Sequence, residues 1–156
     1  MERSVDEKWM RLALDEAKTA FEAGEVPIGA VIVKNGEPVS KAHNLCEQNT
    51  CATAHAELLA INEACRVLKN RRLSDCTLYV TLEPCPMCTG ALINARVGRV
   101  VFAAKDPRAG AMGSLLDLPK YPLEARPTCE FGLMEAESLE LLRLFFAKMR
   151  QKSKKI

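Results

Sequence analysis

The spacing of apolar side chains along the chain predicts four helices. Between residues 6 and 23 apolar side chains recur three or four positions apart, as they do on one face of a helix. They are Trp9, Leu12, Ala13, Ala17, Ala20 and Phe21. Gly24 follows this segment as a helix C-cap would. A similar apolar stripe marks residues 55–68, and two further helices are predicted over 86–95 and 135–151.

A second pattern predicts five strands. Residues 26–33 form a continuous apolar and mostly β-branched run, which is typical of a buried strand. Asn35-Gly36 is a strong hairpin signal, so a second strand is expected over 37–43. Further strands are predicted over 77–82, 97–103 and 128–133, with a loop over 105–127.

The order of these elements predicts an α/β fold. A strand, helix and strand follow one another between residues 77 and 103, which requires a right-handed crossover between parallel strands. We therefore expect a three-layer α/β/α architecture with a mixed five-stranded sheet and helices on both faces. No repeat, low-complexity tract or linker is visible, so residues 1–156 are interpreted as a single domain.

Composition places the chain among soluble globular proteins, with 48% hydrophobic and 27% charged residues. No apolar run approaches the roughly 20 residues that a membrane helix needs. Residues 1–7 are charged and lack the apolar stretch of a signal peptide. The sequence therefore predicts a cytoplasmic protein that does not bind a membrane.

Charge is informative through its distribution, because the formal net charge is only +2. Five basic residues and no acid occur near the end of the chain: Lys148, Arg150, Lys152, Lys154 and Lys155. A basic segment of this kind indicates a phosphate-bearing partner. It also suits the C-terminal end of a helix, where cations are stabilised.

The cysteine count is seven, so the cysteines cannot all pair within one chain. A closely spaced pair, Cys85 and Cys88, in a chain without a secretion signal indicates metal binding or redox chemistry. The other five need no special role, because a free cysteine packs as a small hydrophobic residue. They are Cys46, Cys51, Cys65, Cys76 and Cys129.

Two short motifs offer residue types and spacings that are compatible with a zinc site. One motif, His55-Ala56-Glu57, begins the helix predicted over 55–68. The other, Pro84-Cys85-Pro86-Met87-Cys88, connects a predicted strand to the helix predicted over 86–95. His55, Cys85 and Cys88 offer one imidazole and two thiolates, and a catalytic zinc site typically has three protein ligands and one open position. Two cysteines three residues apart on a first helical turn can converge on one ion, and a helix N-terminus favours their thiolates. Pro86 suits the first turn of that helix.

Glu57 lies two residues after His55, and residues two apart on a regular helix do not share a face. We therefore expect His55 to precede the regular helix and Glu57 to reach round to the ion.

Together the motifs resemble the H-x-E and P-C-x-x-C signature of zinc-dependent nucleoside and nucleobase deaminases. The resemblance implies a cytidine-deaminase-like fold. It also implies that zinc-bound hydroxide attacks the ring carbon that carries the amino group. Glu57 would take the proton of the water and pass it to the ring nitrogen and then to the departing ammonia.

Over nearly the whole chain the sequence resembles the bacterial tRNA adenosine deaminases, which convert a wobble adenosine to inosine. The matching segments are 25–31, 53–57, 78–85, 110–115 and Phe145-Phe146 with the basic residues after them. The resemblance implies a homodimer with one Zn²⁺ per subunit and a tRNA anticodon stem-loop as partner.

The resemblance also assigns residues by position. Asn44 would contact the flipped-out nucleoside, and Pro27 would border its pocket through the backbone. Asp106 would contact the nucleotide backbone beside the target. Lys148 and Arg150 would lie on the helix that meets the anticodon stem-loop. Simpler interpretations are a turn residue for Asn44, a cap or turn for Asp106, and core packing for the two phenylalanines.

The chain departs from the family pattern at two places. Cys51-Ala52 stands before Thr53 where the family usually has Asp-Pro, which changes the loop that flanks the pocket. Ala147 follows the phenylalanine pair where a basic residue is usual.

Three alternatives stay open at this point. A deaminase of a free base or nucleoside, such as guanine, cytosine or cytidine, would share the zinc site but would not need the basic helix. A non-catalytic, zinc-stabilised RNA-binding module would need a fourth ligand, which Cys51 or His43 could supply. A redox pair at Cys85 and Cys88 would explain neither His55 nor Glu57.

Overall fold

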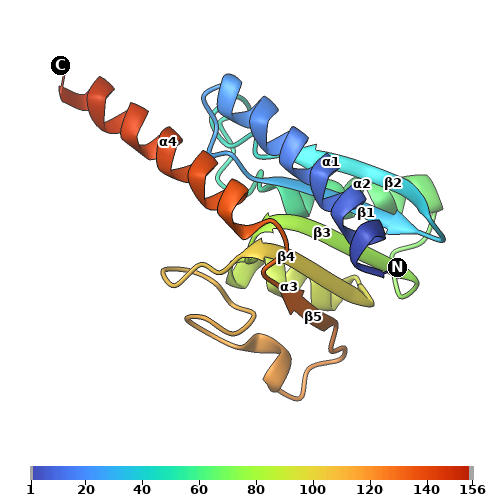
Figure 1. Cartoon of the computed structure of the whole chain (residues 1–156). Coiled ribbons are helices and arrows are strands. Elements are labelled where there is room, and N and C mark those ends of the chain that lie inside the picture. Colours follow the sequence, from blue (N-terminus) through green and yellow to red (C-terminus); the bar gives the residue numbers. More distant parts are fainter. Residues whose placement is uncertain (1, 155–156) are drawn as a thin grey trace.

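Helices and strands alternate along residues 2–154, the part of the chain that this computed structural model describes (Figure 1). In chain order the elements are α1 (Glu2–Glu22), β1 (Gly29–Lys34), β2 (Glu37–His43), α2 (Ala56–Leu68), β3 (Cys76–Leu82), α3 (Pro86–Asn94), β4 (Arg99–Ala104), the short 3₁₀ helix η1 (Leu118–Lys120), β5 (Thr128–Phe131) and α4 (Glu135–Lys154). No helix in this range has both the length and the apolar character needed to cross a membrane.

The five strands form one mixed sheet in the order β2-β1-β3-β4-β5. β1 is antiparallel to both β2 and β3, whereas β3, β4 and β5 are parallel. Asn35 and Gly36 connect β1 to β2 with positive φ angles of 51° and 74°, the backbone that a two-residue hairpin needs. The mixed sheet, the hairpin and the parallel crossover are confirmed.

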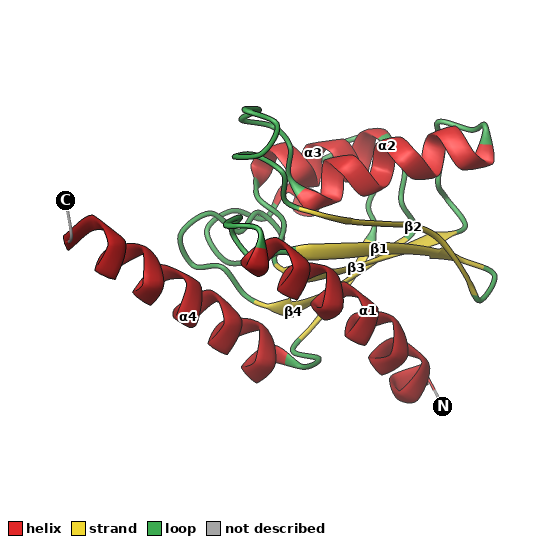
Figure 2. Ribbon diagram, turned by 90° about the horizontal axis from the view of Figure 1, so that it is seen from above, coloured by secondary structure: helices red, strands yellow, loops and turns green. Residues whose placement is uncertain are grey.

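Helices cover both faces of the sheet. α2 and α3 lie on one face, and α1 and α4 lie on the other (Figure 2). Ala30 and Ile32 of β1 pack in the core on the α2 and α3 side, and Val31 and Val33 pack on the α1 side. Two buried faces explain why this strand is apolar throughout rather than alternating.

The helix predicted over 6–23 and the strand predicted over 26–33 differ from the structure at their beginnings. α1 starts at Glu2, and its most deeply buried side chains include Met10 and Leu14, 0% and 1% exposed. β1 starts only at Gly29, because the Ile28 N–H donates to the carbonyl of Val26 and closes a tight turn around Pro27.

One edge of the sheet gathers the loops that matter for function. β2 and β4 end there at His43 and Ala104, β3 ends there at Leu82, and β1 begins there at Gly29. The segments 24–28, 44–55, 83–88 and 105–117 therefore meet at this edge. It is also the edge where the carboxyl ends of parallel strands usually place ligand sites in α/β folds.

Candidate metal centre and active site

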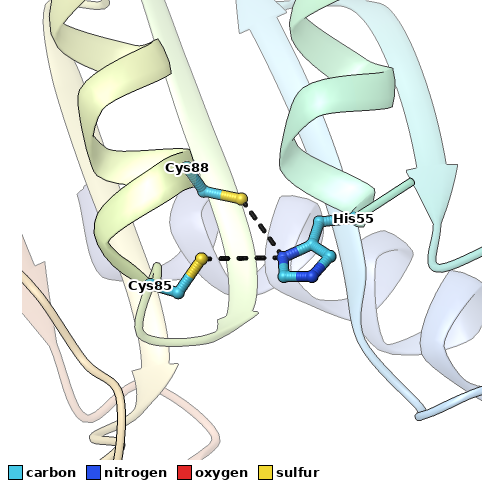
Figure 3. A group of neighbouring side chains, drawn as sticks. All are labelled: His55, Cys85 and Cys88. Carbon is cyan, nitrogen blue, oxygen red and sulfur yellow. Dashed lines mark hydrogen bonds between the residues drawn. The ribbon is translucent and has the colours of Figure 1, made fainter. Parts of the chain in front are cut away.

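His55, Cys85 and Cys88 point toward one another between the beginnings of α2 and α3 (Figure 3). The Nδ1 atom of His55 lies 3.6 Å from Sγ of Cys85 and 3.4 Å from Sγ of Cys88. Zinc bonds in a tetrahedral site place a nitrogen and a sulfur ligand about 3.6 Å apart. The spacing and the donor types therefore fit a zinc ion.

Helix beginnings position all three ligands. His55 precedes α2 with extended backbone (φ −75°, ψ 148°), which confirms the expectation that it lies ahead of the regular helix. Cys85 precedes α3 in the same way, Pro86 occupies its first turn, and Cys88 lies in that turn with its side chain buried. Two helices that start at the same edge of the sheet thus bring residues 55 and 85–88 together.

The hydrogen bond between the two cysteine side chains shifts their pKa values in opposite directions. A hydrogen bond from the Cys88 thiol, with a further one from His55, lowers the pKa of Cys85 to about 4. The same hydrogen bond raises the pKa of Cys88, because its proton is held against the Cys85 sulfur. Metal binding displaces such a proton and leaves both sulfurs as thiolates.

Glu57 places a carboxyl group beside this centre. Its side chain hydrogen-bonds that of Cys88, and the residue is only 4% exposed. Burial raises the pKa of Glu57 to about 7. A carboxyl group with a pKa near neutral pH can both accept and return a proton, which is the requirement for general acid–base catalysis.

Among the described residues the group has three members and no fourth. The Nδ1 atom of His43 pairs with Oε2 of Glu16 at 2.7 Å, and Sγ of Cys51 lies 3.5 Å from Oγ1 of Thr53. Neither candidate for a fourth ligand therefore joins the centre. Three ligands are typical of a catalytic zinc site, whereas a structural site is usually closed by four.

A cavity of about 1010 Å³, which we call the site cavity, opens beside His55. Its wall comes from the segment 24–28, the segment 44–47, the loop 105–108 and the inner side of α4. The metal centre therefore lies at a cavity large enough for a nucleoside-sized ligand.

Asn44 and Asp106 both line the site cavity. Asn44 is buried, and its Oδ1 accepts a hydrogen bond from the N–H of Ala56 at 2.8 Å, which fixes the beginning of α2. Oδ1 of Asp106 accepts hydrogen bonds from the N–H groups of Arg108 and Ala109, so Asp106 also forms a turn. Pro27 is buried, and its neighbours Val26 and Ile28 form the wall instead.

The predicted residues on α4 lie farther from the metal centre. Lys148 and Arg150 are exposed, and neither lines the site cavity. Nζ of Lys148 lies 5.6 Å from the ring centre of Phe21, and Arg150 lines an adjoining groove with Arg108. Lys155, the last residue of the predicted basic segment, lies outside the described residues.

The two phenylalanines of α4 have different environments. Phe145 is core, with its ring 6.0 Å from that of Phe21. Phe146 is 43% exposed and faces the site cavity. The core interpretation therefore holds for the first and not for the second.

Two buried acids at this edge were not found from the sequence. The Glu83 carboxylate accepts hydrogen bonds from the N–H groups of Asp106, Met112 and Ser114 and from the Ser114 hydroxyl. The Glu25 carboxylate accepts from the N–H groups of two consecutive residues, 47 and 48, at 3.0 and 2.7 Å. The only sequence signal that could have identified them is an acidic residue that lies next to an apolar strand with no basic residue nearby.

A three-layer α/β/α fold that carries a three-ligand His-Cys-Cys centre and an adjacent buried carboxyl group defines the class of metal-dependent base deaminases. The comparisons with known proteins agree with this class. The chain belongs to the MafB19-like deaminase family, which it matches over residues 4–150.

Two relatives that align with the chain over nearly their full length are named tRNA-specific adenosine deaminases. The chain is 49% identical to that of Bacillus subtilis (strain 168) over 150 residues, which cover 96% of this chain and 93% of the relative. It is 50% identical to that of Aquifex aeolicus (strain VF5) over 145 residues, which cover 92% of this chain and 95% of the relative.

Two solved structures of deaminases have a fold similar to that of this chain. A structure from work on A-to-I editing by tRNA:A34 deaminases has a TM-score of 0.84 and 43% identity, covering 86% of this chain and 99% of the other. The guanine deaminase of Nitrosomonas europaea has a TM-score of 0.77 and 30% identity, covering 90% and 84%. The predicted fold class is thereby confirmed.

Proposed function

We propose that this protein hydrolyses the amino group of the wobble adenosine in a tRNA anticodon loop, giving inosine and ammonia. The observation that carries the proposal is the convergence of His55, Cys85 and Cys88 beside a nucleoside-sized cavity, with the Glu57 carboxyl group next to them. The identity to tRNA-specific adenosine deaminases over most of the chain supports the choice of substrate.

The three ligands would hold one Zn²⁺ per subunit through Nδ1 of His55 and Sγ of Cys85 and Cys88. When bound, the ion supplies a water that is activated near neutral pH. The ligand set leaves one position open for that water, because no fourth protein ligand is present among the described residues.

Glu57 would move the protons of the reaction. Its carboxylate would accept a proton from the attacking water and deliver it to the ring nitrogen next to the carbon under attack. It would then help to protonate the departing amine. A pKa of about 7, raised by burial, lets the group hold and release this proton near neutral pH.

Asn44 and Asp106 would position the nucleotide. Because Oδ1 of Asn44 already accepts from Ala56, the group it can offer to a nucleoside is its Nδ2 donor. Asp106 uses Oδ1 for its own turn, so Oδ2 can accept from a ribose hydroxyl. The wall beside the base would include the backbone around Pro27. An unstacked loop base can enter such a pocket at low energetic cost.

Basic side chains beside the site cavity would contact the RNA backbone. They are Lys105, Arg108, Arg150, Lys152 and Lys154. None of them forms an ion pair with another described residue. Nζ of Lys105 lies 4.2 Å from the ring centre of Phe131, and the charges of the other four are available for phosphates. Lys148, on the same helix, is exposed and would extend this surface.

A homodimer is part of the proposal. Four large apolar side chains are exposed between β4 and β5: Leu115, Leu116, Tyr121 and Leu123. Exposed apolar residues that cluster along one segment are typical of an interface rather than of a monomer surface. A second copy of the chain would cover them.

The competing function is deamination of a free base, which the likeness to a guanine deaminase structure keeps in view. The basic groove along α4 favours RNA, since a free base would make no use of Arg150 or Lys154.

The test is deamination of a short RNA hairpin with an adenosine first in its anticodon. Purified protein is compared with Glu57→Ala, and inosine and zinc are both measured by mass spectrometry. We expect inosine from the hairpin and none from free adenosine, with one zinc per subunit. Glu57→Ala should keep the zinc and lose about 10²- to 10⁴-fold in turnover, the usual contribution of a general acid–base group.

Cys88→Ala is the matched control, because it removes a ligand and should lose the metal. Zinc loss from a folded Glu57→Ala protein would show that Glu57 is a ligand and not a proton carrier. Turnover of guanine, cytosine or cytidine, with the hairpin unchanged, would replace the proposed substrate by a free base or nucleoside.

A further inference from the structure

A tight turn over residues 46–51, which we call the lip turn, connects Asn44 to His55 at the rim of the site cavity. The N–H of Cys51 donates to the carbonyl of Cys46 at 2.9 Å, and the N–H of Thr50 donates to that of Glu47 at 3.2 Å. Thr50 has a left-handed backbone, with φ 46°. These two nested hydrogen bonds around a left-handed residue define a Schellman motif, which a contact between the side chains of the first and sixth residues frequently accompanies. Here both residues are cysteines.

The lip turn is held in place from the inside of the protein. The buried Glu25 carboxylate accepts the N–H groups of Glu47 and Gln48, and the N–H of Asn49 donates to the carbonyl of Leu45. Cys46 lines the site cavity, and both cysteines are partly exposed. The fixed backbone of the lip turn thus carries one accessible cysteine at each of its ends, close enough for the charge of Cys51 to act on Cys46.

The two thiols differ in reactivity. Hydrogen bonds from Thr53, including its hydroxyl 3.5 Å from Sγ, lower the pKa of Cys51 below its usual value. Burial, with the nearby Glu25 and Cys51 charges, raises the pKa of Cys46. A thiol of lowered pKa next to one of raised pKa is the arrangement of an attacking and a resolving cysteine.

The other cysteines do not combine a lowered pKa with a place in the lip turn. Burial raises the pKa of Cys65 and Cys76. The pKa of Cys129 is raised as well, to about 11, although this residue is exposed. Cys85 and Cys88 belong to the metal centre.

We propose that Cys46 and Cys51 form a reversible dithiol–disulfide couple that a peroxide oxidises. The Cys51 thiolate attacks one oxygen of hydrogen peroxide, the O–O bond breaks, and the departing hydroxide takes a proton to become water. The Cys46 sulfur then attacks the Cys51 sulfenic acid, the S–O bond breaks, and a second water leaves. Two thiols lose two hydrogens, and one peroxide is reduced to two waters.

The test uses the zinc-loaded full chain, one equivalent of hydrogen peroxide, alkylation of the remaining thiols and peptide mass spectrometry. We expect a cross-linked peptide pair joining Cys46 to Cys51, reversal by dithiothreitol, and an unchanged zinc content. Cys46→Ser should stop at a sulfenic acid on Cys51 that dimedone labels. Cys51→Ser should lower the oxidation rate at Cys46 at least about tenfold, because Cys46, with its raised pKa, forms the nucleophilic thiolate less readily than Cys51.

Cys65→Ser is the matched control and should behave as the unchanged chain does. Alkylation of both Cys46 and Cys51 after oxidation would overturn the proposal, and so would equal rates in the presence and absence of Cys51. A first product that links Cys51 to another chain, or that releases zinc from Cys85 and Cys88, would overturn it as well. No readout involves RNA, so the result is independent of the proposed deaminase activity.

Discussion

At the scale of single residues, two buried glutamates at the same edge of the sheet differ because of what surrounds them. Glu57 is 4% exposed and lies beside Cys88, and burial dominates its pKa. Glu83 is 3% exposed, and its carboxylate is held by three backbone N–H groups and one hydroxyl. The first can exchange a proton, whereas the second fixes the loop that carries Asp106.

Glu83→Gln should destabilise the protein and loosen that loop. The amide replaces one acceptor by a donor, so at least one backbone N–H loses its partner. The free energy of unfolding should fall by about 2 kcal/mol, the usual cost of an unsatisfied buried polar group. Urea denaturation measures this, and kcat/KM on the hairpin should fall as well.

Glu124→Gln is the control for Glu83→Gln. Glu124 makes an ion pair with Arg96, but its side chain is 82% exposed, so its loss should change stability little. Equal stability of the two variants would show that the Glu83 hydrogen bonds do not fix the loop.

The convergence of His55, Cys85 and Cys88 could be predicted from the sequence because residue type and spacing alone restrict metal chemistry. Glu25 and Glu83 could not, since their partners are backbone N–H groups more than twenty residues away. Such contacts exist only once the sheet has brought the loops together. The roles of Glu57, Asn44, Pro27, Asp106, Lys148 and Arg150 remain predictions.

At the scale of elements, a run of apolar residues predicts the burial of a segment more reliably than it predicts its secondary structure. Val26, Pro27 and Ile28 look like the beginning of a strand, yet they form a turn, and Val26 and Ile28 line the site cavity. The loop predicted over 105–127 contains η1 as well, which no periodic pattern marks. The remaining helices and strands begin and end within a few residues of their predicted bounds, because hairpin and cap residues mark their ends.

Gly29→Ala tests how closely β1 approaches α1. A Cβ atom at this position would overlap the backbone carbonyl oxygen of Ala13, and backbone cannot move aside cheaply. We expect a loss of about 2 kcal/mol or more in the free energy of unfolding, as for an overpacked core. Thermal or urea unfolding gives the value.

The matched control is Gly90→Ala in α3, where a Cβ atom meets nothing within 4 Å. Alanine is the better helix former by about 1 kcal/mol, so this variant should be as stable as the unchanged protein or more so. If both variants lost the same stability, close packing of β1 on α1 would not be the cause.

Asp6 attaches the beginning of α1 to the sheet and makes stability depend on pH. Its carboxylate accepts from Arg99 at 2.9 and 2.8 Å and from the Tyr79 hydroxyl at 2.6 Å. The hydrogen bonds from Arg99 lower the pKa of Asp6 below its usual value of 3.8. The ionised group therefore stabilises the fold above that value, and this contribution is lost as the pH falls through the lowered pKa.

Asp6→Asn should accordingly be less stable than the unchanged protein at pH 7, by about 2 kcal/mol. The difference should shrink as the pH falls below about 4. Urea unfolding at several pH values tests this, with the exposed Asp75→Asn as control. A difference that stays constant down to pH 3 would contradict the assignment.

At the scale of the whole molecule, the distribution of charged side chains says more about binding than the net charge does. The net charge of +2 hides the gathering of basic side chains around the site cavity and along the end of α4, which projects beyond the sheet (Figure 1). The α/β architecture was predictable because strand and helix patterns alternate in order. The sharing of one cavity by residues 24–28, 44–47 and α4 was not, because it depends on three-dimensional proximity.

The proposed dimer gives a prediction about mass in solution. Light scattering should report twice the 17.2 kDa of one chain. The double variant Leu115→Ser, Leu116→Ser should shift the mass toward a single chain, because it removes apolar surface that the partner would cover. Val67→Ser, an equally exposed site on α2, is the control. A single-chain mass for the unchanged protein at micromolar concentration would rule out the dimer.

The candidate metal ligands lie at the beginnings of two helices, whereas the cavity wall is built largely from loops and from α4. Inherited or engineered changes can therefore act on recognition and leave the reaction centre intact. A library confined to residues 45–47, 105–108 and 146–152 would explore new substrates without touching a ligand. Because recognition and reaction depend on different segments, the substrate of this fold can change while the reaction that it catalyses stays the same.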